Sequence, residues 1–96
     1  MKVLLAEDAY RDLEDIEDYL FERNPEAAFR ILDELLTLLH GQLSRQPRSG
    51  RKTEVKGVRE LVWPPYVIPY EIIDDVVHIQ RVWHAARDPK VKLKKS

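Results

Sequence analysis

"RNPEAA", residues 23–28, marks the clearest boundary in the sequence, and the fold can be worked out in both directions from it. Asn24 suits a helix N-cap, because its side-chain oxygen can accept a hydrogen bond from a backbone N–H of the first turn. Pro25 fits the first helical position, where its missing N–H costs nothing, and Glu26 favours the positive start of a helix. A new helix therefore begins at Pro25.

Apolar residues recur at helical spacing on both sides of this boundary. Asp8 is a candidate cap for the first helix, and Pro47 should stop the second, whose end Gly41 weakens. Because the connection is so short, the two helices should form an antiparallel hairpin. The predicted apolar faces are Ala9, Leu13, Ile16 and Leu20 in the first helix, and Ala28, Ile31, Leu32, Leu35, Leu38, Leu39 and Leu43 in the second.

Strand patterns flank the hairpin. "KVLLA" at 2–6 predicts a short buried strand, and the basic segment 45–57 predicts a loop. Three further strands are expected, separated by Pro64-Pro65 and by a tight turn at Asp74-Asp75. They cover residues 58–63, 66–73 and 76–84.

The order β-α-α-β-β-β predicts an α+β fold, with a helical hairpin packed on a small, mostly antiparallel β-sheet. Pro69 complicates the middle strand, because proline removes a ladder donor. Either a bulge lies there, or the neighbouring strand pairs over only part of its length.

Composition narrows the class of protein. The 96 residues predict a single domain over residues 1–89, followed by a basic tail, 90–96, that we expect to be mobile. No apolar run approaches the roughly 20 residues of a membrane helix. Without cysteine there are no disulfides and no thiolate metal sites, and a cytoplasmic protein is expected.

Charge is distributed unevenly. Residues 1–40 hold four Lys/Arg against eleven Asp/Glu, a balance of −7, whereas residues 45–59 hold six against one, a balance of +5. The acidic helices should repel nucleic acid, and no recognition-helix pattern is present, so stand-alone DNA binding is not expected. The acids on the first helix (Asp12, Glu14, Asp15, Glu17 and Asp18) are interpreted as a solvated face, and no metal site or other cofactor is predicted.

Several motifs in this order resemble the ParE/RelE family of bacterial toxins. They are "A..DL.DI..YL" from Ala9 to Leu20, "P..G" at 47–50, "GVREL" at 57–61, "YVIPYEI" at 66–72 and "IQRVWHAARDP" at 79–89. The forms "GVREL" and "RVWHAAR" look like the ParE branch. The resemblance implies a toxin encoded beside a cognate, ParD-like antitoxin. In this family ParE-like toxins poison DNA gyrase, whereas RelE-like toxins cut messenger RNA in the ribosome, and fold alone does not choose between the two.

The sequence contains candidate site residues for both activities. Metal-free RNA cleavage needs a base, an acid and cations around the phosphorane, for which the chain offers His84, Arg59, Arg81 and Arg87. RelE-type ribonucleases carry a C-terminal tyrosine or a His-Tyr pair, but here no tyrosine follows Tyr70. The alternative is a surface that binds target or antitoxin, made of Arg59, Arg81, Trp83, His84 and Arg87 with Arg51 and Lys52 from the basic segment.

Structural roles compete with these functional ones. Arg59 and Arg81 lie in predicted strands, where each would need an ion partner such as a sheet or helix acid. His84 would be a strand-end imidazole bonded to backbone, and one of Trp63 and Trp83 would belong to the core. The leading prediction is a toxin that binds gyrase, and the alternatives are a ribosome-dependent endoribonuclease and a non-toxic interaction module.

Overall fold

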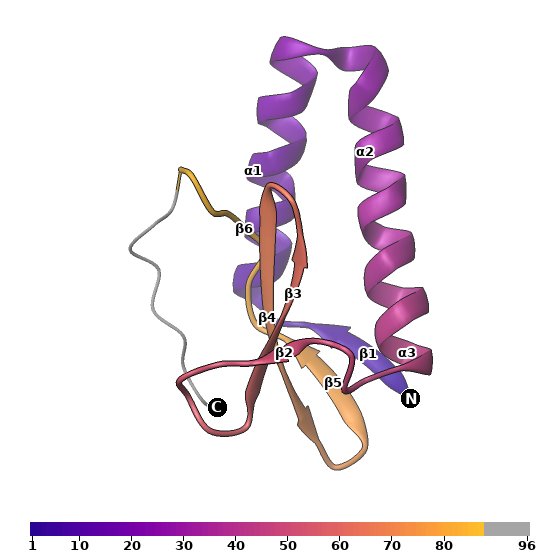
Figure 1. Cartoon of the computed structure of the whole chain (residues 1–96). Coiled ribbons are helices and arrows are strands. Elements are labelled where there is room, and N and C mark those ends of the chain that lie inside the picture. Colours follow the sequence, from indigo (N-terminus) through magenta and orange to yellow (C-terminus); the bar gives the residue numbers. More distant parts are fainter. Residues whose placement is uncertain (88–96) are drawn as a thin grey trace.

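The computed structural model describes residues 1–87, in which two long helices form a hairpin against a mostly antiparallel six-stranded sheet (Figure 1). The predicted α+β fold is confirmed, and the predicted tail at 90–96 lies outside the described residues. In chain order the elements are β1 (Lys2–Leu5), α1 (Glu7–Arg23), α2 (Pro25–Thr37), a π-helical segment η1 (Leu38–Gln42), α3 (Leu43–Arg45), β2 (Arg51–Lys52), β3 (Val58–Trp63), β4 (Tyr66–Ile73), β5 (Val76–Ile79) and β6 (Trp83–His84).

The hairpin turns at Asn24, as predicted. Its side-chain Oδ1 accepts a hydrogen bond of 3.1 Å from the Ala27 N–H, and Pro25 opens α2. The helical path runs on through η1 and α3 and ends before Pro47. The prediction that Asp8 caps α1 is wrong, because Ala6 occupies the N-cap and no side chain bonds there.

The sheet has the order β1-β5-β4-β3-β2, and β6 pairs with β4 beyond the end of β5. All pairs are antiparallel except β1 with β5. The prediction of a buried strand at 2–6 is wrong in part: β1 is an edge strand, with Lys2 and Leu4 exposed. The predicted loop at 45–57 is also interrupted, because α3 reaches Arg45 and β2 pairs with β3.

Pro69 breaks the strand predicted at 76–84. Its carbonyl accepts a 2.9 Å bond from the Gln80 N–H, so its backbone faces β5, where the missing donor would have been needed. Pairing of β4 with β5 ends at Tyr70, and pairing with β6 resumes at Val67, opposite Trp83. The single predicted strand is therefore two, and the second of our alternatives for Pro69 is confirmed.

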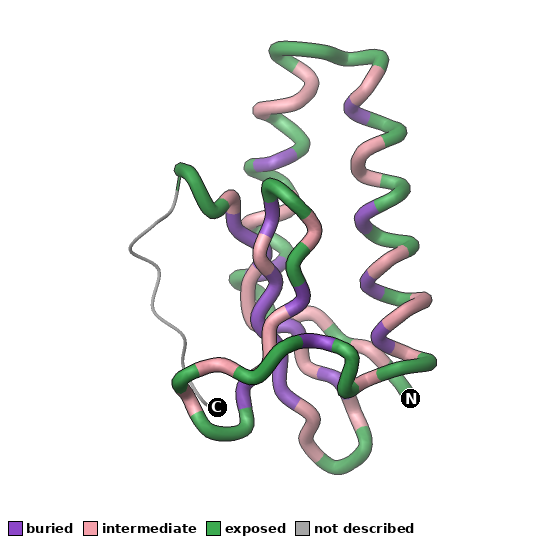
Figure 2. Tube along the Cα trace, in the orientation of Figure 1, coloured by how far each residue is buried: buried purple, intermediate pink, exposed green. Residues whose placement is uncertain are grey.

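The core lies between the helices and one face of the sheet (Figure 2). Beyond the sheet, the connecting end of the hairpin stands clear (Figure 1), and Phe29 there is 71% exposed. Within residues 1–87, neither long helix combines the length and the apolar character needed to cross a membrane. Buried core residues include Ala9, Ile16, Leu35, Leu39, Leu43, Leu61, Ile68, Tyr70, Val77 and Ile79.

Candidate functional site

The predicted site residues fall into two groups. Arg81, Trp83, His84 and Arg87 follow β5, whereas Arg51, Lys52 and Arg59 lie on β2 and β3. On β4 the register partner of Arg59 is Tyr70 and that of His84 is Tyr66. Four residues of strand separate these partners by about 13 Å, and β3 and β6 flank opposite sides of β4, about 10 Å apart. The four residues proposed for RNA cleavage therefore do not converge on one point.

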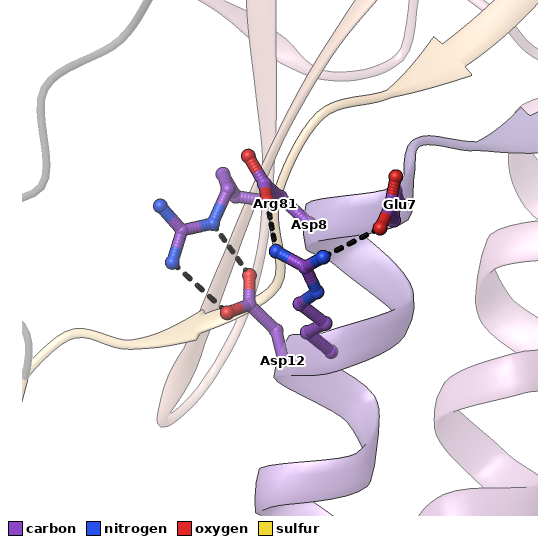
Figure 3. Close-up of polar contacts among 5 residues, drawn as sticks. Glu7, Asp8, Asp12 and Arg81 are labelled. Atoms are coloured by element: carbon purple, nitrogen blue, oxygen red, sulfur yellow. Dashed lines mark hydrogen bonds and ion pairs between the residues drawn. The ribbon is translucent and has the colours of Figure 1, made fainter.

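An ion pair joins helix α1 to the strand break. The Arg81 guanidinium donates to Asp12 through Nε (2.7 Å) and Nη2 (2.9 Å), and the Val82 N–H donates to the same carboxylate at 2.9 Å (Figure 3). The Arg81 side chain is 34% exposed and that of Asp12 is 13% exposed. The alternative that Arg81 pairs with a helix acid is confirmed.

The prediction that all five acids of the first helix form a solvated face is wrong for Asp12, whose side chain is largely buried. The strand break at Pro69 leaves the Val82 N–H outside the ladder, and the Asp12 carboxylate supplies its acceptor. The earlier acids Glu7 and Asp8 contact Arg11 on the surface of α1 instead (Figure 3). Arg81 is therefore compensated by a carboxylate and ties the sheet to the helix.

The His84 side chain is hydrogen-bonded to backbone groups. Its Nδ1 accepts hydrogen bonds from the N–H groups of Ala86 (3.2 Å) and Arg87 (3.3 Å), so the predicted backbone-bonded imidazole is confirmed. Its ring meets Tyr66 edge to face, with centroids 5.8 Å apart. Burial raises the pKa of Tyr66 above 10.0, and the nearby positive charge of Arg87 partly opposes that rise.

Arg87 is the exposed cation of this group. Its guanidinium lies 4.1 Å from the ring centroid of Tyr19, and Arg23 lies 3.7 Å from the same centroid. A hollow of about 230 Å³ adjoins it and combines both signs of charge, so it is not a strongly cationic site. The hollow is lined by Asp12, Asp15, Ile16, Arg81, Val82, His84 and Arg87.

The second group surrounds Gly50. The Gly50 carbonyl accepts a 2.9 Å bond from Arg59 Nη1, and the Gly50 N–H donates to the Tyr70 hydroxyl at 2.8 Å. Arg59 Nη1 also reaches the Arg48 carbonyl at 3.3 Å, so Arg59 bonds to backbone rather than to a sheet or helix acid. The ion pair on this part of the sheet joins Arg51 to Glu60 at 2.6 Å.

The two tryptophans differ as expected. Trp83 is buried, whereas Trp63 is half-buried and stacks on Tyr66 with centroids 6.1 Å apart. Trp63 also lines an open groove of about 530 Å³ between the second helix and β3. The other lining residues are Asp33, Glu34, Thr37, Leu38, Gln42 and Arg45.

Among residues 1–87, no three His, Asp or Glu side chains are grouped so that they could hold a metal ion.

Comparison with known proteins gives the family. The model for the ParE toxin of the type II toxin–antitoxin system parDE matches residues 3–89. The chain belongs to this ParE toxin family. Toxin RelE2 of Caulobacter vibrioides is 44% identical over 80 residues, which cover 82% of this chain and 89% of that protein. Putative toxin Y4kP of Sinorhizobium fredii is 40% identical over 79 residues, covering 80% of each chain.

Solved structures agree with the family. A chain of the chromosomal ParDE system from P. aeruginosa superposes with a TM-score of 0.70 at 26% identity, over 88% of this chain and 95% of that one. A chain of the toxin–antitoxin complex RelBE2 from Mycobacterium tuberculosis gives 0.64 at 30% identity, over 86% and 95%. This ParE-family toxin thus shares its overall fold with both.

Sequence reasoning missed four residues that organise the two groups in this ParE-family toxin. Asp12 was one of five acids on a helix face, and nothing in that pattern singled it out. Gly50 was a loop marker, Tyr70 a strand residue and Arg48 one of several loop cations. A usable signal was the proline inside β4, since a missing ladder donor predicts that a neighbouring strand departs there.

Proposed function

We propose that this ParE-family toxin inhibits DNA gyrase by direct, stoichiometric binding and does not cut RNA. The observation that carries the proposal is that Arg59 lies apart from His84, Arg81 and Arg87, and that Arg81 is itself paired with Asp12. A binding surface, unlike a cleavage site, does not require a base, an acid and cations to meet at one phosphate.

The chemistry of each candidate supports the same reading. His84 Nδ1 is engaged by two backbone N–H groups, and Arg81 is compensated by Asp12. Arg59 lies about 13 Å along the sheet from the position of His84. A general base must come within about 3 Å of the proton that it removes, and a cation must reach the same phosphate.

The names of related toxins do not indicate whether the target is DNA gyrase or ribosome-bound messenger RNA. The curated relatives carry RelE names, whereas the family model and one solved structure carry ParE names. The proposal therefore depends on the residues of this chain.

Neutralisation by a cognate, ParD-like antitoxin is part of the proposal. The groove between the second helix and β3 combines the acids Asp33 and Glu34 with the apolar Leu38 and Trp63. An amphipathic antitoxin segment with apolar and basic side chains fits such a groove, and the neighbours named ParDE and RelBE2 support an antitoxin as partner.

The target is tested with purified toxin. Supercoiling by DNA gyrase should fall in proportion to added toxin, and ribosome-bound messenger RNA should remain intact. Arg87→Glu should weaken inhibition, since Arg87 is an exposed cation without a carboxylate partner among the described residues. His84→Gln should have only a modest effect. Cleavage of message in the ribosomal A site that His84→Gln abolishes would instead establish the ribonuclease.

The antitoxin groove has its own test. Trp63→Ala should weaken antitoxin binding by about 30-fold, the loss of a typical hot-spot residue. Phe29→Ala is the matched control, because Phe29 is exposed on the same hairpin but does not line the groove. Affinities that are equal for wild type and a folded Trp63→Ala variant would place the antitoxin elsewhere.

A further inference from the structure

A group of cations lies at the end of the molecule opposite the connecting turn of the hairpin, around β2 and its connection to β3 (Figure 1). It consists of Arg48, Lys52, Lys56 and Arg59. Within residues 1–87, none of these four forms an ion pair with a carboxylate, whereas Arg11, Arg30, Arg51 and Arg81 all do. Their positive charge is therefore available to a ligand.

Arg59 is held in a fixed orientation. Its Nη1 donates to two main-chain carbonyls, those of Gly50 and Arg48. A guanidinium group has five N–H donors, of which Nη1 carries two. In the part of the chain that the structure describes, the three donors on Nε and Nη2 remain for an outside acceptor.

Tyr70 places a hydroxyl beside this guanidinium. The hydroxyl accepts from the Gly50 N–H, and because the Tyr70 side chain is fully buried, it fixes the Gly50 peptide from below rather than meeting a ligand itself. Burial raises the pKa of Tyr70 above 10.0, against the opposing effects of the Gly50 hydrogen bond and the Arg59 charge, so the hydroxyl stays protonated at neutral pH. The Gly50 peptide thus connects the buried Tyr70 to Arg59 and fixes the position of the guanidinium.

The space between these groups is a hollow of about 190 Å³ lined by Arg48, Gly57, Arg59, Tyr70 and Ile72. This is the volume of roughly six water molecules at about 30 Å³ each, enough for a phosphate group. The lining includes the two cationic residues Arg48 and Arg59 and contains no carboxylate. Such a set of donors selects an anion with several acceptor oxygens.

A second hollow, of about 470 Å³, adjoins the first and shares Gly57 and Arg59 with it. Lys52 and Lys56 line this second hollow, together with one acid, Glu54. Cations outnumber the acid and continue beyond a single anion site, as a chain of phosphates requires; lysine and arginine side chains arranged in this way suit the backbone of a nucleic acid rather than its bases.

We propose that Arg48 and Arg59, the latter held by the Gly50 peptide that rests on Tyr70, form a phosphate site for the backbone of a nucleic acid, extended by Lys52 and Lys56. The site deepens the proposed function and rests on it for where the nucleic acid is met, namely on the gyrase complex. One phosphate site with two flanking lysines gives a weak, salt-dependent contact without sequence preference, which is short of the stable stand-alone DNA binding that the acidic helices make unexpected.

Nuclear magnetic resonance on the full ¹⁵N-labelled chain tests the site without gyrase. Single-stranded oligothymidylate of six residues should shift the Gly50 amide and the Arg59 Nε–H signals in a saturable way. The affinity should fall as salt is raised, with a slope of about −0.7 per phosphate contacted in a plot of log affinity against log salt. A hexaglutamate peptide, which is at least as negatively charged but carries carboxylates in place of phosphates, should produce much smaller shifts.

Two variants complete the experiment. Arg48→Ala, at an exposed loop position, should weaken oligothymidylate binding by about tenfold, and the exposed Arg23→Ala at the other end of the molecule should leave it unchanged. Unshifted Gly50 and Arg59 signals, equal effects of both variants, or equal binding of hexaglutamate would each overturn the proposal. Because gyrase is absent, these outcomes are independent of whether the toxin inhibits it.

Discussion

Removing the Asp12 carboxylate should destabilise the fold far more than removing any neighbouring acid of α1. Asp12→Ala deletes three hydrogen bonds, two from Arg81 and one from the Val82 N–H. Arg81 then keeps its charge in a partly buried position, and Val82, which is 1% exposed, keeps an N–H without its acceptor. Asp15 provides the matched control, because it is exposed on the same helix.

The magnitude follows from these environments. Breaking a fully buried ion pair costs about 3–5 kcal/mol, but Arg81 is 34% exposed, so water reduces its share to about 1–2 kcal/mol. An unsatisfied buried N–H adds about 1–3 kcal/mol. We expect a total of about 3 kcal/mol, a large part of the about 5–15 kcal/mol that stabilises a typical domain. At about 4–8 °C per kcal/mol, the melting temperature should fall by about 12–24 °C.

Thermal and urea unfolding measure this loss, and a double-mutant cycle with Arg81→Ala isolates the pairwise energy. Asp12→Asn keeps an oxygen for the Val82 N–H and should cost less than Asp12→Ala. Asp15→Ala should change stability by no more than about 0.5 kcal/mol. If the Asp12→Ala and Asp15→Ala variants have the same melting temperature, the Asp12–Arg81 ion pair does not hold the sheet to the helix. The same data decide whether lost toxicity in an Arg81 charge reversal reflects unfolding or a missing target contact.

Three further outcomes are expected. Gly50→Ala should lower stability by about 1–3 kcal/mol in urea unfolding, because the new Cβ would lie 2.5 Å from the Tyr70 hydroxyl oxygen; unchanged stability would contradict this packing. Leu35→Asp should prevent folding, since it buries an unpaired carboxylate in the core. Leu13 is half-buried, and Leu13→Asp should also destabilise the fold strongly. A circular dichroism spectrum that matches wild type would refute the core assignment. The free energy of unfolding should decline as pH rises above 10.0, because Tyr70 ionises there in the unfolded chain while in the folded chain, where its pKa is raised, it keeps its proton. Urea unfolding at pH 9 and pH 11 tests the sign of this change. The Tyr70→Phe variant should show a smaller decline.

Local patterns in the sequence were sufficient for the helical hairpin and for the two longest strands. Asn24 and Pro25 mark the turn because N-capping and the fixed φ of proline act within a few residues. The strands at 58–63 and 66–73 have the predicted bounds. The turn at Asp74 and Asp75 has positive φ at both residues, 51° and 61°, which Asp tolerates better than most side chains.

The partners of the site residues were decided only by the tertiary structure. Asp12 and Arg81 are 69 residues apart, and no spacing rule selects Asp12 from the five acids of its helix face. The choice depends on Pro69, which ends the pairing of β5 and places the Val82 N–H and the Arg81 side chain opposite one turn of α1. Likewise, Arg59 and Tyr70 meet across the Gly50 peptide because β3 and β4 are in register at those two residues. Periodicity and capping are set by neighbours along the chain, whereas an ion pair or an anion site is set by strand register and by which backbone groups a sheet leaves unpaired.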